Sequence, residues 1–138
     1  MIPTTGRILE TCLYVADLDR AAEWYRQLFG FPIIFQQEDR LRALQVTQDQ
    51  VLLLFKEKAS LKPTTMPGGV LPPHDGSGPM HIAFAMQTAE ADQWEMHLAI
   101  HGSMHSQSAL TPLNCASTRK ARIVDLGWIL QRSNLAVI

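Results

Sequence analysis

Hydrophobic positions in the first half of the chain change their spacing several times, and each change marks a new element. Residues 8–15 form an apolar-rich run that favours a strand. Apolar residues then recur at helical spacing between Asp17, which stands at an N-cap position, and Gly30, which stands where glycines end helices. Three further apolar runs read as strands between short polar turns: residues 31–35, 40–46 and 50–55. This half therefore predicts a β-α-β-β-β module.

The same order of signals recurs later in the chain. His81 opens a second apolar run, Thr88 stands at an N-cap position, and Gly102 ends a second helical stripe. Glu10 and His81 are 71 positions apart, and so are Asp17 and Thr88. A repeat of this kind indicates two copies of one βαβββ unit. We therefore expect an α+β fold built from two such modules.

A stretch rich in proline and glycine separates the two copies. Residues 59–79 hold five of the eight prolines and four of the eight glycines, so we expect loop here rather than helix or strand. We interpret residues 59–78 as a linker that also covers the mouth of a site. The expected organisation is one domain, residues 1–138, with modules at about 7–58 and 79–138.

Composition narrows the class of protein. The 138 residues are 46% hydrophobic and 18% charged, as in ordinary soluble globular proteins, and the formal net charge is −1. That charge gives no electrostatic case for binding nucleic acid or anionic membranes. No window approaches the roughly 20 apolar residues of a membrane span, and the first residues lack a signal-peptide pattern. Cys12 and Cys115 lack CxxC spacing. We expect a cytoplasmic protein.

The repeat also supplies candidate chemistry, because Glu10 and His81 occupy equivalent places in the two copies. If the modules pack with approximate two-fold symmetry, a carboxylate and an imidazole converge, and such a pair suits Zn, Mn, Fe(II), Co or Ni. The alternatives are a strand-end histidine with its hydrogen bonds satisfied and a solvated or arginine-paired glutamate. Further side chains are expected to line an apolar pocket beside the pair: Cys12, Tyr14, Leu52, Leu54, His74 and Ala83.

Two segments resemble the vicinal oxygen chelate superfamily, which includes glyoxalase I, bleomycin resistance proteins and extradiol dioxygenases. "LETCLYVADLDRAAEWYRQLFGF" is similar to its first strand and helix, and "GPMHIAFAM" to the first strand of its second module. The resemblance covers about residues 7–103. It implies paired βαβββ modules that form a cupped mixed sheet around a metal site, commonly in a homodimer. Glu10 and His81 match the positions of metal ligands in many members.

The sequence departs from the family pattern in two places. Some members carry a glutamate on the fourth strand, where this chain has the apolar VLLLF with Leu54 nearest the position. The family's final turn and ligand glutamate are also missing, since no glutamate follows Glu95. The tail can still form strands at ARIVDL, GWIL and LAVI, so the C-terminal module is expected to be atypical. It does not supply the usual third ligand.

Three functional hypotheses follow. In the first, Glu10 and His81 hold a divalent metal (Zn, Ni, Mn or Fe) that acts as a Lewis acid on a small substrate with vicinal oxygens, as in a lyase or dioxygenase. Glu10 can alternatively act as a general base. The second hypothesis is a bleomycin-resistance-like protein that binds a small apolar molecule without chemistry. The third is an inactive scaffold with an altered C-terminus.

Overall fold

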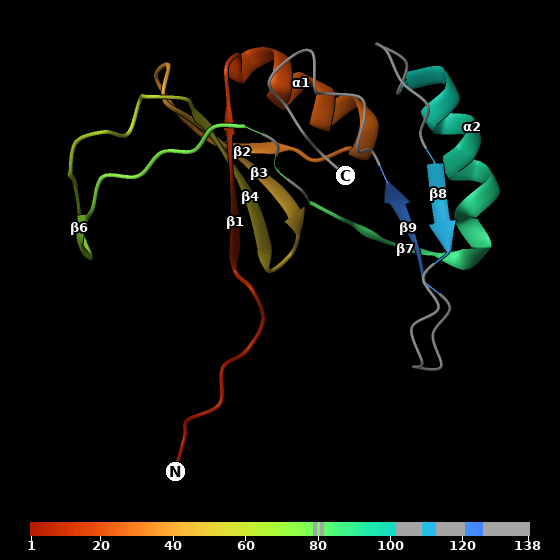
Figure 1. Ribbon diagram of the computed structural model, residues 1–138, viewed down its shortest axis with the longest axis horizontal. Helices are drawn as coiled ribbons and strands as arrows, with labels where there is room; N and C mark the ends of the chain where they lie inside the picture. The colour runs from red at the N-terminus through yellow and green to blue at the C-terminus, as the bar shows by residue number, and fades with distance from the viewer. Residues whose placement is uncertain (79, 81, 102–108, 113–120, 126–138) are drawn as a thin grey trace. The chain divides into compact units, whose positions relative to one another are not determined.

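The protein is described from a computed structural model that covers residues 1–78, 80, 82–101, 109–112 and 121–125 (Figure 1). The chain divides into two units, Met1–Gly76 and Ser77–Ile138. Both units combine strands with one α-helix, which confirms the predicted α+β fold. His81, Gly102, Cys115 and the predicted strands GWIL and LAVI lie outside the described residues.

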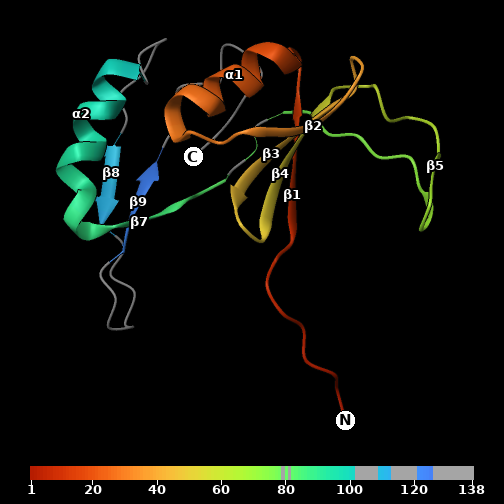
Figure 2. The same ribbon diagram turned by 180° about the vertical axis from the view of Figure 1, so that it is seen from behind.

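A four-stranded mixed sheet forms the centre of the first unit (Figures 1 and 2). Its order is β1-β4-β3-β2, with β1 parallel to β4 and the other neighbours antiparallel. The strands agree with the predicted ones to within one or two residues, so the predicted β-α-β-β-β module is confirmed. Their bounds are β1 Glu10–Val15, β2 Ile33–Gln37, β3 Leu41–Thr47 and β4 Gln50–Lys56.

Helix α1 (Leu18–Phe29) begins and ends where the sequence predicts. The Asp17 side chain accepts a hydrogen bond of 3.0 Å from the backbone N–H of Arg20, as an N-cap does. Gly30 ends the helix in the left-handed conformation, with φ 71°, and its N–H donates to the carbonyl of Arg26 at 2.9 Å. The apolar stripe of the helix is buried: Leu18, Ala21, Ala22, Tyr25 and Leu28.

The core of the first unit lies between α1 and one face of the sheet. α1 contacts β3 and β4, and Arg42 of β3 donates to the carboxylate of Asp19 on α1 at 2.8 Å and 3.1 Å. Strand residues on this face are buried: Leu13, Val15, Leu44, Leu52 and Leu54. Burial of these apolar side chains stabilises the unit, and the Arg42–Asp19 pair fixes the helix on the sheet.

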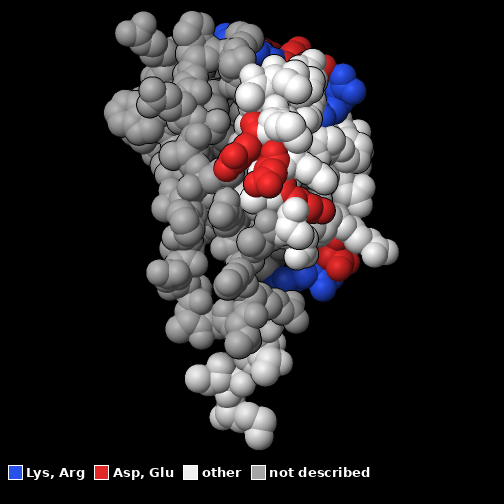
Figure 3. Space-filling view, turned by 90° about the vertical axis from the view of Figure 1, so that its right-hand side faces the viewer, with Lys and Arg blue, Asp and Glu red and all other residues white. Residues whose placement is uncertain are grey.

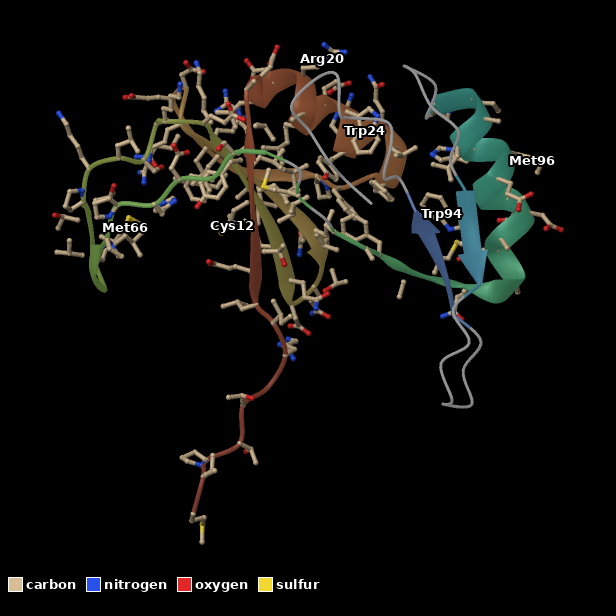
Figure 4. All side chains as sticks on the ribbon, viewed as in Figure 1. Cys12, Arg20, Trp24, Met66, Trp94 and Met96 are labelled. Carbon is tan, nitrogen blue, oxygen red and sulfur yellow. The ribbon has the colours of Figure 1, made fainter. Side chains whose placement is uncertain are left out.

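The connection after β4 contains a hairpin that the sequence analysis did not predict. β5 (Thr64–Met66) pairs antiparallel with β6 (Gly69–Leu71), so the expectation of pure loop at 59–79 is wrong for these residues. Pro67 and Gly68 reverse the chain, and the residues that flank them favour extended backbone. The hairpin extends away from the sheet, with Met66 exposed on it (Figure 4).

The second unit places α2 (Ala91–His101), preceded by a 3-10 turn at Thr88–Glu90, beside a small antiparallel sheet. The sheet order is β7-β9-β8, with β7 Ala85–Gln87, β8 Ala109–Pro112 and β9 Ala121–Asp125. β9 confirms the predicted strand at ARIVDL. Of the strand predicted from His81, the described residues 82–84 are not in a strand, and residues 85–87 pair with β9.

Helix α2 buries Ala91 and Leu98 of the predicted stripe, while Trp94 is half-buried. Figure 3 views the side on which α2 lies, and acidic side chains gather there among uncharged ones. The acidic residues of this segment are Glu90, Asp92 and Glu95. Neither helix in the described part of the chain is long and apolar enough to cross a membrane.

Candidate functional site

The face of the four-stranded sheet that does not pack on α1 is the candidate site, and we call it the open face. Residues paired across adjacent strands point to the same side of a sheet. Cys12 pairs with Leu53, and Tyr14 pairs with Phe55, whose ring lies 5.9 Å from the Tyr14 ring. The register therefore assigns these residues to the open face: Glu10, Cys12 and Tyr14 of β1; Val51, Leu53 and Phe55 of β4; Leu41, Ala43 and Gln45 of β3; and Phe35 of β2.

The register corrects the predicted pocket lining. Leu52 pairs with Thr11 and Leu54 pairs with Leu13, so both leucines lie on the α1 side, where they are fully buried. They do not share a face with Cys12 and Tyr14. The open-face positions of β4 are the alternate ones, Val51, Leu53 and Phe55. The run VLLLF has no polar residue that marks the phase of the strand, so only the pairing reveals it.

The middle of the open face is an apolar floor, and we use this name for Cys12, Leu53, Ala43 and Phe35, which neighbour one another across the four strands. Phe35 is 54% exposed, Leu53 is half-buried and the small side chain of Ala43 between them is buried. Cys12 is an exposed free cysteine on β1 (Figure 4). Exposed apolar surface of this kind typically marks a place where another molecule binds.

Glu10 stands at one end of the floor, at the beginning of β1, and its side chain is exposed. Cys12 follows it on the same face of the strand. Desolvation by neighbouring atoms, and after it the negative charge of Glu10, raises the pKa of the Cys12 thiol. The thiol is therefore held in its protonated form at neutral pH, and Glu10 is the acidic side chain at this end of the floor.

The other end of the floor is closed by a returning segment, residues 58–76, which we call the strap. Tyr14 and Nδ1 of His74 form a hydrogen bond of 2.9 Å between the Tyr14 hydroxyl and the imidazole. The His74 ring also meets the edge of Phe55 at a centroid distance of 4.6 Å. The structure thus brings together two predicted pocket residues that are 60 positions apart.

Hydrogen bonds join the two ends of the strap to each other. The backbone N–H of His74 donates to the carbonyl of Ser60 at 2.9 Å, and the N–H of Lys58 donates to the Asp75 carboxylate at 3.0 Å. Gly76 lies against Tyr14, because a Cβ at this position would be 2.5 Å from Cδ2 of the ring. The strap is therefore a closed loop with joined ends, and His74 is held at its base.

Arg40 supports the same end from the side of β3. Its guanidinium lies 5.8 Å from the Phe55 ring centroid and donates to the Ser60 hydroxyl and to the Gln37 side-chain oxygen, both at 3.1 Å. Burial raises the pKa of Tyr14, and at alkaline pH the negative charges of the Cys12 thiolate and of Asp75 raise it further, so the hydroxyl keeps its proton at neutral pH. The sequence analysis missed Arg40, Phe55 and Ser60, because only the fold brings them to the strap.

The structure gives a partial account of the predicted metal site. Glu10 is suited to bind a cation, since its carboxylate is exposed and forms no salt bridge within the described part of the chain. His81 lies outside the described residues, and Ala83 is an exposed residue outside any strand. Among the residues that the structure describes, no three His, Cys, Asp or Glu side chains are close enough to share a metal ion.

Comparisons with known proteins agree on the architecture. The sequence model of the Glyoxalase/Bleomycin resistance protein/Dioxygenase superfamily matches residues 7–102. Lactoylglutathione lyase from Agrobacterium tumefaciens is 28% identical, with a TM-score of 0.66 over 80% of this chain and 81% of that one. No curated protein is a significant match to the chain.

More distant structures share the fold alone. An integron cassette protein from the mobile metagenome of the Halifax Harbour sewage outfall is 14% identical, with a TM-score of 0.63 over 96% of both chains. The fosfomycin resistance protein FosX from Listeria monocytogenes, in complex with Mn(II) and 1S,2S-dihydroxypropylphosphonic acid, is 16% identical. Its TM-score is 0.51, over 79% of this chain and 74% of that one.

Proposed function

This chain belongs to the Glyoxalase/Bleomycin resistance protein/Dioxygenase superfamily, and we propose that it is a metal-dependent enzyme acting on a small molecule with vicinal oxygens. The observation that supports this proposal is the position of Glu10. Its carboxylate stands at the edge of an exposed apolar floor, so one group can bind a cation while the floor holds the body of a substrate.

In this proposal Glu10 and His81 are the protein ligands of a divalent metal, Zn, Ni, Mn or Fe. Two ligands are fewer than the three that catalytic zinc sites usually have, so substrate oxygens and water would complete the coordination. The bound metal would supply Lewis-acid polarisation of those oxygens. The Mn(II) in the FosX structure shows that the fold accommodates such an ion in another protein. Glu10 can also accept a proton as a general base.

Metal analysis of the purified chain tests this proposal. After incubation with each metal and dialysis, we expect about one ion per chain in the wild type and less than about a tenth of that in Glu10→Gln and in His81→Ala. Glu57→Gln and His101→Ala are matched controls, since neither residue is on the open face, and should keep the ion. A wild-type chain that binds no metal, or a His81→Ala chain that keeps it, would contradict the proposal.

A bleomycin-resistance-like binding protein is the second candidate, and the apolar floor favours it. Such a protein would bind an apolar molecule without metal, and Glu10→Gln would leave the affinity unchanged. The dye N-phenyl-1-naphthylamine, which fluoresces when it is buried in apolar surroundings, measures this. We expect Leu53→Lys to abolish dye binding under either candidate. An inactive scaffold would bind neither metal nor dye.

Two finer features complete the proposal. Members of the superfamily often dimerise, and we propose that this chain works as a homodimer. The location that we propose is the cytoplasm. Size-exclusion chromatography with light scattering tests the first point, and fractionation of expressing cells tests the second.

A further inference from the structure

The strap gives the open face two chemically different ends. Glu10 and Tyr14 are four residues apart on β1, so they lie about 13 Å from each other at roughly 3.3 Å per strand residue. The apolar floor fills the interval, with Cys12 and Leu53 side by side. If the proposed function is correct, a substrate of one or two rings that engages Glu10 also reaches Tyr14.

The hydrogen bond between Tyr14 and His74 leaves one donor uncommitted in either arrangement of its proton. If the Tyr14 hydroxyl donates to Nδ1, the neutral imidazole carries its proton on Nε2, which is then a donor. If Nδ1–H donates to the tyrosine oxygen, the Tyr14 hydroxyl hydrogen is the donor that remains. Neither group makes another hydrogen bond within the described residues, so the pair can donate to a ligand.

Arg40 adds a positive charge at the same end. Its guanidinium donates to the neutral side chains of Ser60 and Gln37, and no carboxylate among the described residues forms a salt bridge with it. The nearest acidic group of the strap, Asp75, already accepts the backbone N–H of Lys58. A cation with neutral partners beside an apolar surface favours an anionic ligand group.

The aromatic side chains of the open face indicate the shape of the ligand. Phe35 exposes its ring at the floor, and the half-buried ring of Tyr14 stacks on Phe55 with an interplanar angle of 26°. Phe55 itself is buried, so Phe35 and Tyr14 are the rings that a ligand can reach. Rings of this kind pack best against another flat ring. We propose that Tyr14, His74 and Arg40 form a specificity element for the far end of the substrate, which is a flat aromatic molecule whose anionic acceptor group is bound at the strap.

Two dyes that differ in a single group test this inference. 1-Anilinonaphthalene-8-sulfonate carries a sulfonate on the same ring system as N-phenyl-1-naphthylamine, which has none. We expect the wild-type chain to bind the sulfonate dye about tenfold more tightly, because a charge-assisted hydrogen bond forms only with that dye. The fluorescence of each dye is titrated with protein, and the stoichiometry should be one dye per chain.

Variants then show which residues cause the preference for the sulfonate dye. The double variant Tyr14→Phe, His74→Leu should lose the tenfold preference while its affinity for the neutral dye stays the same, since the floor is intact. Arg40→Gln should reduce the preference about threefold. Lys62→Gln removes an exposed strap cation that makes no hydrogen bond with Tyr14 or His74, and should change neither affinity. If the double variant fails to fold, Arg40→Gln provides the test, because it removes the positive charge and leaves the Tyr14–His74 hydrogen bond in place.

The outcomes separate this inference from the proposed function. Equal binding of both dyes by the wild type overturns the specificity element and leaves the small-molecule site standing. A preference that stays tenfold in both Arg40→Gln and the double variant, or in Arg40→Gln alone if the double variant does not fold, overturns it as well. If neither dye binds, the small-molecule site itself is wrong, and the specificity element falls with it.

Discussion

The two faces of the four-stranded sheet are built from the same strands but serve opposite purposes. On the α1 side, Leu13, Leu52 and Leu54 are buried together under the helix. On the open face, Cys12 is exposed and Leu53 only half-buried. The difference shows that a strand such as β4, apolar on both sides, contributes to stability with Leu52 and Leu54 and offers Val51 and Leu53 on its other side to a ligand, while Phe55 is buried against Tyr14 and His74.

Substitutions of two adjacent leucines of β4 should give the largest difference in stability between the two faces of the sheet. Leu54→Ala leaves a cavity under α1 and should lower the free energy of unfolding by about 3 kcal/mol. Leu53→Ala should cost less than about 1 kcal/mol, because its side chain is half-exposed before the change. Urea denaturation followed by circular dichroism measures both. Equal losses would mean that the open face is also a packed core.

The glycines of the strap give the next largest effect. Gly76→Ala places a methyl group where Tyr14 lies, so we expect the Tyr14–His74 hydrogen bond to break and the free energy of unfolding to fall by about 1–2 kcal/mol. Gly68→Ala is the matched control, since nothing lies within 4 Å of the added carbon. Thermal denaturation of both variants makes the comparison. An unchanged Gly76→Ala protein would contradict the close contact with Tyr14.

A chemical probe of the open face should show a smaller effect. Desolvation and then the Glu10 charge raise the pKa of Cys12, so Glu10→Gln lowers that pKa and increases the fraction of reactive thiolate. In a Cys115→Ser background, we expect iodoacetamide to react with Cys12 about twofold faster in Glu10→Gln at pH 8. Glu38→Gln should leave the rate unchanged. An unchanged rate in Glu10→Gln would show that the Glu10 charge does not act on the Cys12 thiol.

The smallest effect is expected on the outer side of α1, which faces neither the core nor the floor. Hydrogen bonds from Arg26 and Gln27 lower the pKa of Glu23 from 4.5 to about 2. The lowered folded-state pKa means that Glu23 stabilises the protein above pH 4.5 and that this contribution is lost as pH falls towards 2. Glu23→Gln should lower Tm by a few degrees at most at pH 7. The gap from the wild type should close between these pH values in thermal scans.

Local sequence signals predicted the first unit well, because the residues that begin and end its helix and strands can be recognised in the sequence itself. Asp17 and Gly30 bound α1 in both sequence and structure, since capping depends only on nearby backbone groups. The site required information that no local pattern holds. The phase of β4 comes from its pairing with β1, which placed Leu53 rather than Leu54 on the open face. The contact of His74 with Tyr14 comes from the path of the strap.

Hydrogen bonds join the two ends of the strap, so the position of His74 does not depend on the length of the chain between them. Lys58 with Asp75, and Ser60 with His74, close the loop below the β5–β6 hairpin, so the hairpin does not position the imidazole. Closing a longer loop costs little extra entropy, because the cost grows only with the logarithm of length. Related or engineered chains should therefore accept inserted segments in the hairpin while His74 keeps its position beside Tyr14.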